Sequence, residues 1–155
     1  MRIWISFPAF LAALSLGIAA AQPADLTGSW HLSVEKSRWG KLVKPLSVVL
    51  TIAHQEPRLD YHGVVQYANE DTREFSFSGS LDGGEYAMSR SFGDGMITLR
   101  RIDPWTVEST FRSNDGRCVE TAQTTIARSG KTLTRRLRVQ SPEGRKSWTE
   151  HYDRR

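Results

Sequence analysis

The sequence has few of the residue patterns that cross-link chains, bind metals or carry out catalysis. Cys118 is the only cysteine among 155 residues, so no disulfide can form within the chain. The four histidines form no H-x-H or H-x-x-x-H pair and have no cysteine cluster beside them, so we expect no metal site. No G-x-S-x-G turn is present to carry a nucleophile. We therefore expect neither an enzyme nor a bound cofactor.

A strong clustering of charge is also missing. Lys and Arg number 21 against 17 Asp and Glu, which gives a formal net charge of +4. Apart from Arg135, Arg136 and Arg138, the basic residues are spread along the chain. Nucleic-acid binding needs a concentrated basic face, so we expect no nucleic-acid partner.

The first 21 residues predict a secretory signal peptide. Arg2 is the only charge before residue 25, and the apolar stretch that follows it ends in Ala19-Ala20-Ala21. A basic start, an apolar segment and small residues at the end are typical of a cleaved signal. An uncleaved anchor is the alternative, but Pro8 and several small polar residues interrupt the stretch. We expect cleavage after Ala21, a single mature domain over residues 22–155 with no membrane span, and export to the periplasm or the medium.

The rest of the chain alternates between apolar and polar residues with the period of a β-strand. Turn residues separate the alternating segments, and nearly all of these turns are too short for a crossover helix, so neighbouring strands should pair antiparallel. Only Glu35–Pro45 is long enough to hold a short helix. The ten candidate strands are Thr27–Val34, Leu46–Ala53, Arg58–Tyr67, Arg73–Gly79, Glu85–Ser89, Met96–Ile102, Thr106–Arg112, Arg117–Arg128, Lys131–Gln140 and Arg145–Tyr152.

Turn lengths predict a register for the last five strands. With loops at Asp103–Trp105, Ser113–Gly116, Ser129-Gly130 and Ser141–Gly144, one apolar face continues from strand to strand. A slip of one residue in any hairpin would turn its strand inside out, so this agreement favours the register. The predicted pairs are Ile97–Phe111, Leu99–Ser109, Phe111–Cys118, Ser109–Glu120, Ile126–Leu133, Leu133–Tyr152, Arg135–Glu150 and Leu137–Trp148.

One short motif adds a resemblance to a known family. Gly28-Ser29-Trp30 opens the first mature strand and resembles the G-x-W of lipocalins and their calycin relatives. The segment from Gly28 to Ser33 is also similar to small exported bacterial proteins of unassigned function. Residues 23–26 differ from the family's usual sequence before the glycine, and the disulfide of many lipocalins cannot form.

The expected fold is all-β: an antiparallel up-and-down meander closed into a lipocalin-like barrel of about eight to ten strands. Closure would protect the edges of such a sheet. A two-sheet sandwich is the alternative. The resemblance implies that Trp30 plugs the closed end and that a basic residue from a late strand packs across it. We expect Arg135 in that role, neutralised by Glu150, although Arg135 receiving a ligand carboxylate is a second interpretation.

The interior has two interpretations. In the first it is hollow and holds a small, mostly apolar molecule, with Tyr61, Phe77, Phe111 and Trp148 as walls and Ser109 and Glu120 as polar contacts. In the second it is packed shut with side chains, and the protein is an inhibitor or assembly factor that binds an unknown protein partner through its loops. By register Glu120 faces inward, as a ligand contact or a carboxyl with a raised pKa; the alternatives are that local twist turns it to solvent or that Ser109 and water satisfy it. Cys118 is expected to be an inert apolar group.

Overall fold

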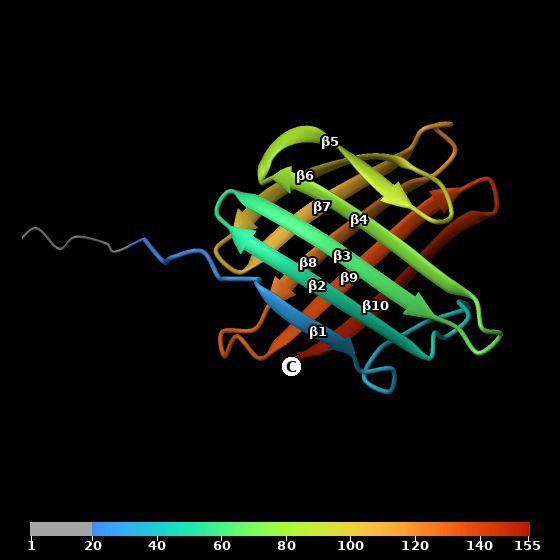
Figure 1. The fold of residues 1–155 in the computed structure, drawn as a ribbon, viewed down its shortest axis with the longest axis horizontal. Helices are drawn as coiled ribbons and strands as arrows, with labels where there is room; N and C mark the ends of the chain where they lie inside the picture. The colour runs from blue at the N-terminus through green and yellow to red at the C-terminus, as the bar shows by residue number, and fades with distance from the viewer. Residues whose placement is uncertain (1–19) are drawn as a thin grey trace, which may run out of the picture.

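The computed structural model describes residues 20–155, and in this part of the chain it shows ten β-strands and no helix (Figure 1). Each predicted strand is present, with its ends displaced by a few residues at most. The predicted signal peptide lies almost wholly outside the described residues and stays a prediction. The strands are β1 Gly28–Leu32, β2 Ser47–Gln55, β3 Arg58–Gln66, β4 Thr72–Ser80, β5 Asp82–Arg90, β6 Gly95–Asp103, β7 Thr106–Ser113, β8 Val119–Ile126, β9 Thr132–Ser141 and β10 Gly144–Arg154.

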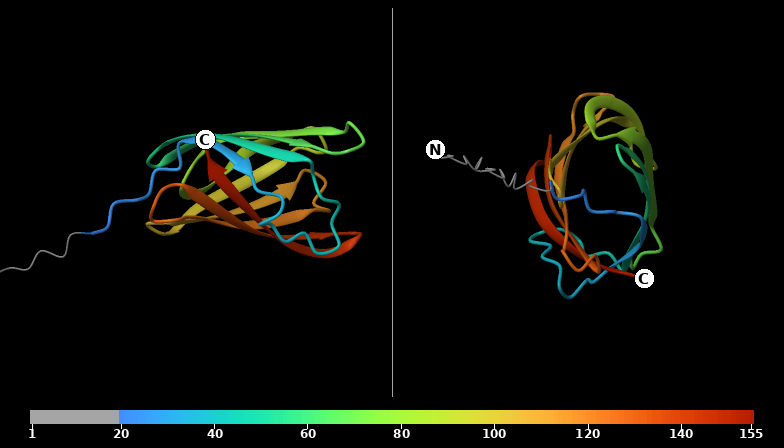
Figure 2. Two further views of the ribbon diagram at one scale, coloured as in Figure 1. Left: turned by 90° about the horizontal axis from the view of Figure 1, so that it is seen from below. Right: turned by 90° about the vertical axis from the view of Figure 1, so that its left-hand side faces the viewer.

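The strands close into one barrel. Every strand pairs antiparallel with its neighbours in the chain, and β1 completes the ring by pairing with both β2 and β10. Figure 2 shows this ring from one end and the long side of the barrel from another. Closure leaves no unpaired edge strand. The predicted fold class, an antiparallel meander closed into a barrel, is confirmed. No helix within residues 20–155 is long and apolar enough to cross a membrane.

The register predicted for the last three strands is confirmed. Arg135 lies opposite Glu150 and Leu137 opposite Trp148 in the pairing of β9 with β10. In the pairing of β8 with β9, Ile126 lies opposite Leu133. The hairpin turns here have the lengths that their Gly, Ser and Pro residues indicate.

The register predicted for the β7–β8 hairpin is wrong by two residues. Phe111 lies opposite Glu120 rather than Cys118, and Ser109 lies opposite Ala122 rather than Glu120. The four-residue loop is displaced by one residue, to Asn114–Arg117, because Ser113 pairs with Cys118: the Cys118 backbone N–H donates to Ser113 Oγ over 2.9 Å, and the Ser113 N–H donates to the Cys118 carbonyl. A shift of two keeps every side chain on its predicted face.

The connector between β1 and β2 forms turns, not the short helix that its length allowed. Arg38 makes a backbone bridge to Thr149 of β10, which fixes the connector against the end of the barrel. Trp39 is buried, and its indole N–H donates to the Val34 carbonyl over 3.3 Å. The connector therefore folds over the barrel end at which β1 finishes.

The opposite end of the barrel is closed around Trp30, which has no exposed surface. Its indole N–H donates to the Leu26 carbonyl over 2.9 Å, and Leu26 itself is buried in the same core. The cation above the Trp30 ring is Arg154, at 4.5 Å from the ring centroid. The prediction that Arg135 covers Trp30 is wrong, because Arg154 is the direct cross-strand neighbour of Trp30 whereas Arg135 faces Tyr61.

Candidate functional site

A cavity of about 690 Å³ lies inside the barrel. It extends from the core toward the end formed by the connector and by the loop around Tyr67–Asp71, with Phe92 at its rim. Successive hairpins alternate between the two barrel ends, so this mouth lies opposite the closed end at Trp30. The volume falls within the range of roughly 300–1,000 Å³ that is usual for small-molecule sites.

One wall of the cavity is a stack of aromatic rings from β3 and β4. The ring centroids of Tyr61 and Phe77 are 5.0 Å apart and the rings are nearly parallel, and the Phe75 ring lies 6.0 Å from that of Tyr61. Gly63 makes this arrangement possible, because a Cβ at that position would overlap the Phe75 ring. These side chains occupy alternate positions in neighbouring strands, so the pleat directs all of them inward.

A polar cluster on the β9–β10 side of the cavity is held together by hydrogen bonds to Glu150. Glu150, only 7% exposed, accepts hydrogen bonds from Arg135 Nη1 at 3.1 Å, the Tyr152 hydroxyl at 2.7 Å and the Trp148 indole N–H at 2.8 Å. Burial and the Glu150 charge raise the pKa of Tyr152. The Tyr61 hydroxyl, also buried, has no hydrogen-bond partner among the described residues, and burial raises its pKa to about 12.

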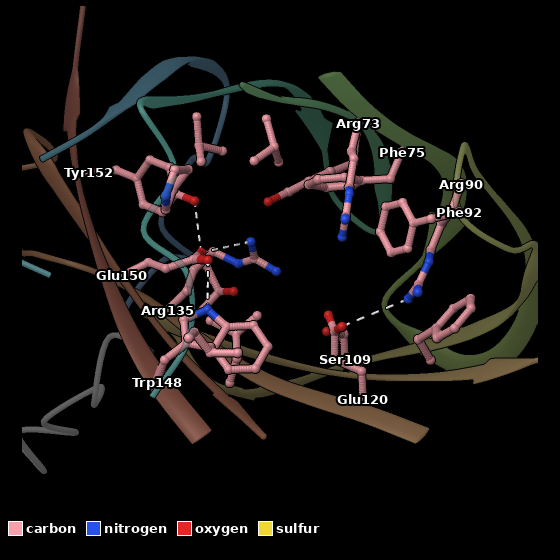
Figure 3. A pocket seen from close by; sticks show the side chains of 18 of the residues that line it. Arg73, Phe75, Arg90, Phe92, Ser109, Glu120, Arg135, Trp148, Glu150 and Tyr152 are labelled. Atoms are coloured by element: carbon pink, nitrogen blue, oxygen red, sulfur yellow. Dashed lines mark hydrogen bonds and ion pairs between the residues drawn. The ribbon is translucent and has the colours of Figure 1, made fainter. Parts of the chain in front are cut away.

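A second polar cluster is formed by Arg90 of β5 and by Glu120 of β8, the strand next to β9 (Figure 3). Arg90, at the end of β5, points toward Glu120 of β8, and Nη1 is 3.8 Å from Oε2, which is too long for a hydrogen bond. The rings of Phe92 and Phe111 lie on the Arg90 guanidinium, 4.1 and 4.0 Å from its central carbon. Burial lowers the pKa of Arg90. Burial also raises the pKa of Glu120, although Arg135 and Arg90 act to lower it.

The mouth of the cavity carries both apolar and basic side chains. Val43, in the connector, is 76% exposed, and Phe92 is 46% exposed. Arg73 lies between the rings of Tyr67 and Phe92, at 5.1 and 5.5 Å, and donates to Asp71 over 3.1 Å. Apolar surface at a rim allows an apolar molecule to approach without crossing a continuous polar barrier.

Residues predicted as ligand contacts come together in this cavity. The six that line it are Tyr61, Phe77, Ser109, Phe111, Glu120 and Trp148. Their contact with a ligand stays a prediction. Arg135 and Glu150, expected at the closed end beside Trp30, line the cavity as well.

Sequence reasoning missed Arg90. The predicted strand stopped at Ser89, whereas β5 continues to Arg90, which lies opposite Phe75 of β4. The sequence did contain a signal for Arg90: it follows Tyr86 and Met88 at every second position, which places all three side chains on the same face of the strand.

The cavity can enclose an apolar molecule and offer it a small number of polar contacts. None of its described lining residues is a histidine, and no group of three or more His, Cys, Asp or Glu within residues 20–155 could hold a metal ion. Comparison with known proteins names no family: no protein-family model matches the sequence, and a search of the curated proteins finds no match.

Proposed function

We propose that this protein is an exported binding protein for a small, mostly apolar molecule held inside the barrel. The observation that carries the proposal is the cavity of about 690 Å³, which joins an aromatic wall to a mouth with exposed apolar residues. Mostly apolar walls with a few polar groups are typical of small-molecule sites. The lipocalin-like closed end at Trp30 supports the same function by resemblance alone.

Binding accounts for the cavity better than catalysis does. The polar cluster on the β9–β10 side is built around Glu150, whose carboxylate already accepts three hydrogen bonds. Ser109 has no histidine beside it among the residues lining the cavity to act as a base. The proposal therefore assigns no catalytic residue, cofactor or metal to this chain.

The test is a titration of the mature chain with N-phenylnaphthylamine, a neutral dye that fluoresces in apolar sites. Val65 lines the cavity near its mouth, whereas the side chain of its neighbour Val64 is on the opposite face of β3. Val65→Trp should fill part of the cavity and weaken dye binding by about tenfold or more, since a blocked site removes most of the contact area. Val64→Trp, the matched control, should leave the binding unchanged.

Two outcomes would contradict the proposal: no saturable binding of the dye, or equal weakening in both variants. A second candidate function, a module that binds a protein partner through its loops, would then be favoured. It has one observation of its own, the exposed apolar side chains Val43, Leu46 and Phe92.

A further inference from the structure

Arg90 is a buried cation whose hydrogen-bonding groups are not all used. Only 8% of its side chain is exposed, and its Nε has no partner among the described residues. The nearest carboxylate, Glu120, lies 3.8 Å away, at ion-pair but not hydrogen-bond distance. Arg135, by contrast, donates directly to Glu150. A buried N–H without a partner costs free energy, so a ligand that accepts a hydrogen bond from Arg90 removes this cost.

The surroundings of Arg90 hold its guanidinium in place without satisfying it. The Phe92 and Phe111 rings lie 4.1 and 4.0 Å from its central carbon and attract its charge, but they offer no carbonyl or carboxylate oxygen. Gly95 leaves the space for Phe111, because a Cβ there would overlap that ring. A planar guanidinium stacked on aromatic rings still presents N–H groups along its edge, where an anionic group binds.

Glu120 determines which kind of ligand the site takes. The charged and titratable groups near the pair of Glu120 and Arg90 are Arg135, Glu150, Tyr61 and the Cys118 thiol, which lies beside Arg90. Arg135 pairs directly with Glu150, whereas Arg90 is the cation at ion-pair distance from Glu120. An ionised Glu120 neutralises Arg90 and leaves room for a neutral ligand only. A protonated Glu120 leaves Arg90 free to balance a second anion.

Building on the proposed function, we infer that the ligand is an anionic amphiphile whose negative group accepts hydrogen bonds from Arg90, displaces Glu120 as its partner, and binds together with a proton that Glu120 takes up. The apolar body of the ligand then lies along Phe75, Phe77 and Tyr61. The anion and the proton enter together, so the charge of the cavity does not change. The pKa of Glu120, which burial raises, makes this proton uptake easier than at an exposed carboxyl.

The test compares two dyes that differ by one negative group. Anilinonaphthalene sulfonate is N-phenylnaphthylamine with a sulfonate added, and the sulfonate stays ionised at all working pH values. Arg90→Met should weaken binding of the sulfonate dye by about 10- to 100-fold, the usual effect of losing a hydrogen bond to a charged group. Binding of the neutral dye should change by less than about twofold, within the scatter of such measurements. Arg112→Met, which removes an exposed arginine of β7 next to Phe111, is the matched control and should alter neither dye.

The uptake of a proton by Glu120 on ligand binding is tested with Glu120→Gln, a neutral replacement of similar shape. In the natural protein, affinity for the sulfonate dye should fall as pH rises through the pKa of Glu120, which burial raises above that of an exposed carboxyl, because the ionised Glu120 competes for Arg90. In the variant the affinity should stay high and lose this pH dependence. If Arg90→Met does not fold, the double variant Arg90→Met/Glu120→Gln, which strands no buried charge, is used in its place.

The inference is overturned if Arg90→Met weakens both dyes equally or neither, or if Glu120→Gln keeps the pH dependence. These results differ from failure of the proposed function, in which neither dye binds saturably to the natural protein. Competition by decanoate but not by decanol would extend the result from the sulfonate to a carboxylate.

Discussion

Arg135 and Glu150 show how a buried ion pair is held in this interior. The Glu150 carboxylate accepts three hydrogen bonds, and the side chains of both partners are about nine-tenths buried. Removing one charge leaves the other without a partner inside the protein. Such losses are larger than the net contribution of the intact pair, because the stranded charge keeps its desolvation cost.

We therefore expect Arg135→Met to lower the free energy of unfolding by about 3–5 kcal/mol. The double variant Arg135→Met/Glu150→Gln leaves no unpaired charge and should recover a large part of this loss. Urea denaturation of the three proteins measures both effects. Equal stability of the single and double variants would show that Glu150 does not depend on Arg135.

Trp30 is the second residue whose surroundings predict a large effect. It has no exposed surface, donates a hydrogen bond to Leu26 and lies under the Arg154 guanidinium. Trp30→Ala should lower the free energy of unfolding by about 3–5 kcal/mol through lost burial and a residual cavity. Phe92→Ala, which removes a half-exposed ring from the mouth, is the control and should cost much less. A similar loss in both variants would contradict the assignment of Trp30 as the plug of the closed end.

The strands and hairpins explain which parts of the fold were predictable. The β9–β10 register follows from turn chemistry, since Pro142 and Gly144 mark a short loop. The β7–β8 loop is displaced by one residue from its predicted position because Ser113 and Cys118 pair across it, a contact between side chain and backbone that has no periodic signal. A shift of two residues leaves each side chain on the same face, which is why Phe111 and Glu120 were placed on the inner face although their partners across the β7–β8 hairpin were wrong.

Two other features depend on contacts between distant elements and were missed for that reason. Arg154 covers Trp30 only because β10 pairs with β1 across the closure of the barrel, and local sequence does not give that register. Arg90 lies where β4 and β5 pair over three positions only, so the pairing was too short to predict from sequence where β5 ends. The cavity itself is a property of packing around the whole ring.

The barrel is packed around Trp30 at one end and hollow from there to its mouth. The buried core cluster includes Trp30, Leu50 and Leu133, whereas the cavity extends from Leu26 and Tyr152 to the mouth at Phe92. A hollow interior sacrifices packing contacts that a filled core would make. Filling the hollow part with a larger side chain should therefore keep or raise the stability of the fold and weaken ligand binding.

Val65→Trp tests this difference at the level of the whole fold. In a hollow barrel the added ring enters empty space and gains contacts, so the melting temperature should stay the same or rise by a few degrees, about the effect of 1 kcal/mol in a domain of this size. In a barrel packed shut, the same ring would overfill the core and lower the free energy of unfolding by about 1–3 kcal/mol. Val64→Trp controls for placing tryptophan on β3, and thermal unfolding followed by circular dichroism gives the measurement. A lower melting temperature for Val65→Trp than for Val64→Trp would contradict a hollow interior. A higher melting temperature together with lost dye binding would show that the dye binds in the same empty space whose filling stabilises the fold.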